Sequence, residues 1–152
     1  MAGLRWLDER QQRAWRGYLA MTGQLAARLH RQLQADSGLS LADFDVLVQL
    51  TGRPEPRARV LELASTLQWE KSRLSHHLAR MGRRGLITRE ECPGDARGAF
   101  IVLTPAGRRA IERAAPAHVA TVRHLMFDHL TGEQVDTLHA ITETVLARLR
   151  DG

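Results

Sequence analysis

The sequence predicts a mainly α-helical protein with one small β-hairpin, an α+β arrangement in a single domain. Apolar residues recur at three- and four-residue steps along most of the 152 residues, which is the period of a helix. This period is interrupted between residues 86 and 103, where turn-forming residues gather. No apolar run approaches the roughly 18 residues that span a bilayer, and charges follow the N-terminus at once, so we expect neither a membrane span nor secretion.

Two helices are predicted in the first third of the chain. The first covers about residues 8–36, where apolar side chains recur at helical spacing, and Ser37 and Gly38 end it. Ser40 is a residue type that caps helix N-termini, and a second helix follows it as far as Gly52.

Two short helices and a hairpin are predicted in the middle third. The helices cover about residues 60–67 and 70–84, with a tight connection between them. Residues 86–91 and 99–103 are short and rich in β-branched or apolar side chains. The segment between them is dense in turn formers, so it predicts a hairpin with a charged tip.

Two more helices are predicted after the hairpin. Thr104 has the residue type of an N-cap and Pro105 suits the first helical position, so a fifth helix begins here and continues to about Leu130. Pro116 lies inside that run and should kink or locally break it. Thr131 begins a last helix that remains amphipathic to the end of the chain.

The outer helices have more apolar surface than a small monomer easily buries. Packing the first, fifth and sixth helices against their copies in a second chain removes this surface from water through a two-fold interface. A bundle of the three helices within one chain is the alternative. We therefore expect dimerisation helices in residues 1–36 and 104–152, with a separate binding region in residues 37–103.

Positive charge is concentrated in the middle third. The chain has 22 basic and 17 acidic residues, a net charge of +5. Residues 53–103 contain ten basic and six acidic residues, which leaves +4 of this charge in that third. Such a local basic block is typical of a surface that meets phosphates, although a solvated basic face is the simpler alternative.

The middle third has the order of a helix-turn-helix followed by a wing. The residues that carry the resemblance below are Leu63-Ala64, Ser75, Leu78, Gly85-Leu86-Ile87, Arg89, Asp95-Ala96-Arg97 and Leu103-Thr104-Pro105-Ala106-Gly107. On these residues, and on the surrounding helix order, the chain resembles the MarR family of winged helix-turn-helix transcriptional regulators. The resemblance implies one MarR-like domain over residues 1–152, acting as a homodimeric regulator, most often a repressor, on a near-palindromic double-stranded DNA operator.

Two residues depart from the family's pattern. Glu70 stands where the family usually has a Ser or Thr cap, and a carboxylate can still cap a helix. Arg59 replaces a typical Thr before the first helix of the motif. Neither change removes the wing or the recognition face.

The fourth helix is the expected recognition helix. With Leu74, Leu78 and Met81 on its inner face, a rotation of about 100° per residue places a polar face opposite, which suits the major groove of B-DNA. On this face we expect Arg73 and His76 to contact bases, Lys71, Arg80 and Arg83 to contact phosphates, and Ser72 and Ser75 to contact either. An Arg-rich solvated face is the alternative. His77 lies nearer the inner side, where a packed histidine is at least as plausible as a DNA contact.

The wing is expected to act in the minor groove. Arg97 lies near the tip of the hairpin, where a narrow minor groove would attract its charge. The family resemblance implies that Asp95 orients Arg97. A plain charged turn is the alternative.

No motif for catalysis or a cofactor is found in the sequence. It has no Ser/His/Asp arrangement, Gly-rich phosphate loop or His-Glu-x-x-His motif, so we expect no enzyme and no cofactor. The seven histidines lack the spacing that places metal ligands on one helix face, so we expect no metal site. Cys92, the single cysteine, fits a reducing cytoplasm and is expected to be a passive thiol rather than a redox switch.

The resemblance also implies a small-molecule effector, aromatic or anionic, bound between the dimer helices and the winged helix. Four residues belong to helices that would line such a crevice, and each could equally be core: Trp15, Tyr18, His30 and Phe44. The competing function is a winged-helix dimer that binds another protein, or sequesters a regulator, without contacting DNA.

Overall fold

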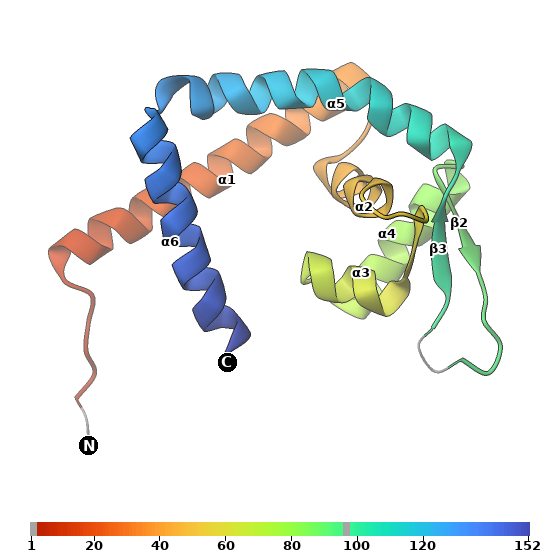
Figure 1. Ribbon diagram of the computed structural model, residues 1–152, viewed down its shortest axis with the longest axis horizontal. Helices are drawn as coiled ribbons and strands as arrows, with labels where there is room; N and C mark the ends of the chain where they lie inside the picture. Colours follow the sequence, from red (N-terminus) through yellow and green to blue (C-terminus); the bar gives the residue numbers. More distant parts are fainter. Residues whose placement is uncertain (1–2, 96–97) are drawn as a thin grey trace.

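The chain folds into a winged unit, residues 41–103, attached to one end of a pair of long helices (Figure 1). The computed structural model describes residues 3–95 and 98–152. Helices α1 (Glu9–Ser37) and α5 (Pro105–Leu125) lie along each other. The winged unit lies beneath the N-terminal end of α5, and α6 (Gly132–Arg150) leaves the other end in a different direction.

Side-chain caps set the ends of the first two helices, as the sequence predicts. Asp8 and Gln11 form a reciprocal capping box at the start of α1, and α1 ends at Gly38 with a left-handed φ of 72°. A second capping box joins Ser40 and Asp43 at the start of α2 (Leu41–Thr51). Only Gly38, Leu39 and Ser40 connect the end of α1 to the start of α2.

The helix-turn-helix and the hairpin are confirmed. Helices α3 (Val60–Leu67) and α4 (Lys71–Arg83) flank a turn in which Gln68 takes a left-handed φ of 56°. Strands β2 (Ile87–Glu90) and β3 (Phe100–Leu103) form the antiparallel hairpin.

A third strand was missed by the sequence analysis. Strand β1 (Arg57–Arg59) pairs antiparallel with β3, so the sheet has the order β1-β3-β2. The strand has only three residues and one apolar side chain, Ala58, so the sequence shows no alternation of apolar and polar residues there. The strand exists because its backbone completes the free edge of β3, which is a tertiary effect.

The expected fifth helix is too long at its C-terminal end. Helix α5 passes through Pro116 without a break and ends at Leu125. Pro116 has no N–H to donate, so the helix lacks one hydrogen bond at this position, and α5 packs against α1. A 3-10 turn (Phe127–His129) then leads to the Thr131 cap of α6. The expectation that the helix reaches Leu130 is therefore wrong.

One hydrophobic core occupies the winged unit. Leu74, Leu78 and Met81, the expected inner face of α4, are buried, and Leu63 and Ile101 close the core from α3 and the sheet. The end of α1 and the start of α5 also reach this core, through Leu33, Ile111 and Ala114. The winged unit and the adjoining ends of the long helices therefore share one hydrophobic core.

The outer helices are unlike this core. Helix α6 buries no residue, and its Ile141 and Leu149 are 56% and 70% exposed. On α1, Trp15 and Tyr18 are about half exposed. An intramolecular bundle would bury these side chains, so the described residues do not form the bundle that the sequence left open.

Candidate nucleic-acid interface

Helix α4 presents the polar face that the sequence predicts. Its inner residues are buried in the core, while the opposite side faces solvent. The exposed residues of that side are Lys71, Ser72, Arg73, His76, Arg80 and Arg83, with Ser75 partly exposed at its flank. The structure therefore brings these expected DNA contacts together on one accessible surface.

Trp69 supports Arg73 at the start of this face. The Arg73 guanidinium lies 4.7 Å from the centre of the Trp69 ring, within cation–π range. The same ring meets the His77 imidazole edge to face at 5.6 Å. Trp69 thus links the turn of the motif to Arg73, a role that the sequence analysis missed.

His77 is a packed residue rather than a surface one. It is 8% exposed, and its Nε2 lies 2.9 Å from Asp43 Oδ1. Its Nδ1 lies 3.2 Å from the guanidinium of Arg80. Because arginine only donates hydrogen bonds, Nδ1 is the acceptor, and the ring proton is placed on Nε2, facing Asp43. His77 is therefore buried beneath the polar face of α4, where it contacts the side chain of Arg80.

Asp43 links α2 to the recognition helix. Its carboxylate accepts hydrogen bonds from the Ser40 N–H at 2.9 Å and from Arg84 at 2.7 Å. Burial by itself raises the pKa of Asp43, but the contacts with His77, Ser40 and Arg84 together hold the pKa well below its ordinary range. Asp43 is therefore ionised in the folded protein and holds α4 near its C-terminal end. The sequence analysis did not identify Asp43.

The start of α5 is joined to the end of α4. The Thr104 hydroxyl donates to the Gly85 carbonyl at 2.6 Å and accepts from the Gly107 N–H at 2.9 Å. At Gly107 a Cβ would lie 2.1 Å from the Leu86 carbonyl oxygen, so only glycine fits this approach. These contacts join the start of α5 to the segment between α4 and the wing.

The wing is held to β1 by charged and aromatic contacts. Arg59 pairs with the expected wing residue Asp95 at 2.8 Å, and its guanidinium stacks on Phe100. Arg97, the expected minor-groove residue, lies outside the described residues. The structure therefore describes the base of the wing tip but not its arginine.

A shallow hollow separates the recognition helix from the wing. Its walls come from α4, β2 and β3, and the lining residues are Ser75, Leu78, Ala79, Gly82, Ile87, Thr88, Arg89 and Ile101. Arg89 is exposed at this hollow, which adds a cation between the two expected DNA-binding elements.

The four expected effector residues lie in two places. Trp15 and Tyr18 stack at 5.8 Å on the exposed part of α1. His30 accepts the Leu41 N–H at 3.2 Å, and Phe44 packs on His118, so both lie where α2 begins. At 1.5 Å per residue, Trp15 and His30 are about 22 Å apart along α1. One chain therefore does not gather the four into a single pocket.

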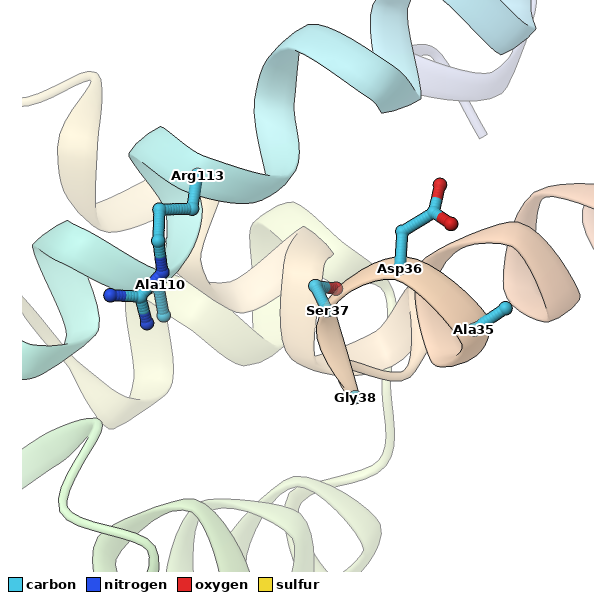
Figure 2. A pocket seen from close by; sticks show the side chains of 6 residues that line it. All are labelled: Ala35, Asp36, Ser37, Gly38, Ala110 and Arg113. Atoms are coloured by element: carbon cyan, nitrogen blue, oxygen red, sulfur yellow. The ribbon is translucent and has the colours of Figure 1, made fainter.

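A separate polar hollow lies between the end of α1 and the first half of α5. Figure 2 shows its lining residues, which are Ala35, Asp36, Ser37, Gly38, Ala110 and Arg113. None of the four expected effector residues is among them. The polar side chains among the lining residues are those of Asp36, Ser37 and Arg113 (Figure 2).

His118 and Asp45 lie at the contact between α2 and α5. Burial lowers the pKa of His118, against the charge of Asp45, which raises it. Burial has the opposite effect on the carboxyl group of Asp45, whose pKa it raises. Within residues 3–95 and 98–152, the buried Nδ1 of His118 has no hydrogen-bond partner. The α2–α5 contact therefore contains an incompletely satisfied polar group.

Residues 3–95 and 98–152 contain no group of three or more His, Cys, Asp or Glu side chains placed to hold a metal ion. In the same residues no helix is both long and apolar enough to cross a membrane.

Comparison with known proteins relates this architecture to one family. The MarR family model matches residues 37–98. AbsC, a MarR family transcriptional regulator from Streptomyces coelicolor, is 37% identical over 98% of this chain and all of its own, with a TM-score of 0.90. Sco3205, a MarR family transcriptional regulator from the same organism solved in complex with DNA, is 40% identical over 96% of this chain and 91% of its own, with a TM-score of 0.89.

A more distant structure shares the fold alone. CouR from Rhodococcus jostii RHA1, solved with p-coumaroyl-CoA, is 22% identical over 85% of this chain and 90% of its own, with a TM-score of 0.72. No curated protein sequence matches the chain.

Proposed function

The chain belongs to the MarR family of transcriptional regulators, and we propose that it acts as a homodimer that binds a near-palindromic operator in double-stranded DNA. The observation that carries this proposal is the outward face of α4. Its arginines, lysine, histidine and serines are accessible to solvent on one side of the helix. Such a helix fits the major groove, with its N-terminal residues against base edges.

Each side chain of this face has a proposed role. Arg73 and His76 contact bases, because an arginine can bond guanine through two N–H groups and a histidine can donate to a base acceptor. Lys71, Arg80 and Arg83 contact phosphates. Ser72 and Ser75 are short enough to bond either group. The contacts of Trp69 with Arg73, and of His77 with Arg80, support this arrangement because they order two of the cations before DNA arrives.

The outer helices are proposed to form the dimer. The exposed apolar side chains of α1 and α6 would be covered by the same helices of a second copy. Residues 1–36 and 104–152 are then the dimerisation helices, and residues 37–103 are the DNA-binding region. A two-fold dimer carries two copies of α4, so the operator has half-sites about one helical turn apart.

The wing is proposed to add a minor-groove contact through Arg97, oriented by Asp95. Arg97→Ala should weaken operator binding by roughly 1–3 kcal/mol, because the loss of one positioned arginine costs about this much. A gel-shift titration with unchanged affinity would remove Arg97 from the interface.

Regulation by a small aromatic or anionic molecule is the further part of the proposal, with the protein acting as a repressor in the cytoplasm. The effector would shift the population toward dimers whose recognition helices are wrongly spaced. Helix α2 suits this coupling because adjacent residues face different elements: Asp43 contacts α4, and Phe44 contacts His118 of α5. Effector contacts by Trp15, Tyr18 and His30 would then require both chains of the dimer.

Binding to the DNA upstream of the protein's own gene tests the proposal. Fluorescence anisotropy on that duplex should give an affinity that falls steeply with salt, because phosphate contacts release counterions. Arg73→Ala should weaken the interaction, whereas Arg53→Ala, a cation that pairs with Glu62 and lies outside α4 and the hairpin, should not. Salt-independent binding, or no binding to any duplex at low salt, would favour the protein-binding alternative instead.

A further inference from the structure

Arg59 makes an unusual set of contacts for a residue at the end of a strand. Its side chain is 12% exposed, and its guanidinium lies 2.8 Å from a carboxylate oxygen of Asp95. The same nitrogen donates to the Gly98 carbonyl at 3.0 Å. Asp95 and Gly98 flank the tip of the wing in the sequence, so one side chain holds both ends of the tip.

An aromatic ring fixes the guanidinium in place. The guanidinium carbons of Arg57 and Arg59 each lie 4.2 Å from the centre of the Phe100 ring. Arg59 is directly opposite Phe100 in the β1–β3 register, so the side chains share one face of the sheet. Arg57 also pairs with Glu90 of β2 at 3.7 Å. Strand β1 is therefore linked to both strands of the wing.

The position of Arg59 makes these contacts informative. Arg59 is also the N-cap residue of α3, and its side chain makes no capping hydrogen bond there. A Thr at this position would cap the helix, a contact worth about 1 kcal/mol, but its short side chain would not reach Asp95. The chain thus lacks a helix cap and has a cation directed at the wing instead.

We propose that Arg59 is a positioning residue for DNA recognition by the wing. By holding Asp95 and Gly98, it fixes the two described residues that flank Arg97 in the sequence. A planar guanidinium suits this role because it contacts a carboxylate and a carbonyl while stacking on a ring, which a lysine ammonium does not do. The inference rests on the proposed DNA-binding function and adds a residue to it.

Arg59→Gln tests the proposal against Arg53→Gln as a matched control. Arg53 lies six residues earlier in the chain and pairs with the exposed Glu62. Operator affinity should fall about tenfold in Arg59→Gln, which corresponds to about 1.4 kcal/mol, and should be unchanged in Arg53→Gln. Hydroxyl-radical footprinting should show that minor-groove protection at the operator flanks is lost, while dimethyl sulfate footprinting should show that protection of guanine N7 in the major groove persists.

A double-mutant cycle separates positioning from direct contact. If Arg59 acts through the wing tip, Arg59→Gln should have little further effect in the Arg97→Ala background. Additive losses would mean that Arg59 contacts a phosphate itself, and they would overturn the proposal. Circular dichroism and thermal unfolding check the fold of each variant. Should Arg59→Gln fail to fold, Arg59→Lys keeps the charge and should show the same selective loss at the flanks.

The outcomes separate this inference from the function on which it rests. A wild-type protein that binds no duplex overturns both. A wild-type protein that binds its operator, with an Arg59→Gln variant of equal affinity and an unchanged footprint, overturns the role of Arg59 alone.

Discussion

The winged unit and the outer helices use similar side chains with opposite results. In the winged unit, Leu74 and Leu78 of α4 lie four residues apart and are buried among neighbours from the same chain. On α6, Ile141 and Val145 lie at the same helical spacing but are 56% and 52% exposed. The apolar pattern is equivalent, and the difference is whether one chain supplies the covering surface. Only the winged unit is complete within a single chain.

The difference separates two kinds of stability. The winged unit and the helix ends packed on it should unfold with a free energy set by their own core. The stability of the outer helices should depend on protein concentration, because their apolar faces are buried only on association. A substitution confined to one region tests whether the other region responds.

The largest effect is expected from charges placed on α6. Ile141→Asp combined with Val145→Asp should weaken the dimer by about 3–6 kcal/mol. The dimer loses four apolar side chains, two from each chain, and each is already about half buried in one chain, so each loses roughly 0.8–1.5 kcal/mol of burial. Light scattering after size-exclusion chromatography should then show a monomer at concentrations where the wild type is a dimer. Operator affinity should fall with it, because two recognition helices no longer act together.

The matched control for this prediction is Glu143→Gln, an exposed polar residue between the two sites on the same helix. It should leave the dimer intact. A double variant that is still a dimer would show that α6 does not form the interface.

A smaller effect is expected in the core of the winged unit. Leu74→Ala should lower the free energy of unfolding by about 2–5 kcal/mol, because it leaves a cavity among fully buried neighbours. Urea denaturation followed by tryptophan fluorescence measures this change. A loss below 1 kcal/mol would mean that the core is more loosely packed than the burial of Leu74 indicates.

The link between α2 and α4 should contribute less. Asp43→Asn removes the carboxylate that contacts His77 and Arg84, and we expect a loss of about 1–3 kcal/mol, the cost of leaving buried polar partners unsatisfied. Operator binding should weaken as well, because the position of α4 depends on this contact. Equal stability of the variant and the wild type at neutral pH would contradict the role of Asp43.

The same variant predicts a pH dependence with a definite sign. The folded protein holds the pKa of Asp43 below the ordinary aspartate value, so the stabilising contribution is complete above that value, about 3.9. It is lost as the pH falls from there toward the lower pKa of the folded state. The stability difference between wild type and Asp43→Asn should therefore narrow below about pH 4. A difference that widens with acid would contradict this assignment.

Several features of the fold were readable because local chemistry specifies them. Capping residues and glycines predicted the ends of α1 and α2 to within one residue, and Thr104 with Pro105 located the start of α5. Strand β1 was not readable, because three residues between turns become a strand only when β3 lies beside them. The end of α5 was misjudged because the apolar spacing continues through a 3-10 turn.

The candidate site divides in the same way. Helical periodicity was enough to predict which residues of α4 face outward. The contacts behind them, such as Asp43 with His77 and Arg59 with Asp95, join residues far apart in sequence, so no local pattern predicts them. Arg59 was noticed only as a departure from the family pattern, and its partner became evident once the sheet was formed.

The smallest effect is expected at a surface ion pair of the winged unit. Arg53 and Glu62 lie 2.8 Å apart, with side chains 31% and 48% exposed. Glu62→Gln should change the free energy of unfolding by less than about 1 kcal/mol, because such pairs are screened by solvent and salt. A larger loss in urea denaturation would show that surface charge, and not only the core, stabilises this region.

The mass of the protein on its operator tests the central claim most directly. The outer helices are proposed to be covered by a second copy, so that two recognition helices meet one duplex. Native mass spectrometry of the complex should give the duplex plus twice the 17.1 kDa of one chain, with no population carrying a single chain. A complex of one chain with one duplex, at saturating operator and undiminished affinity, would contradict the account.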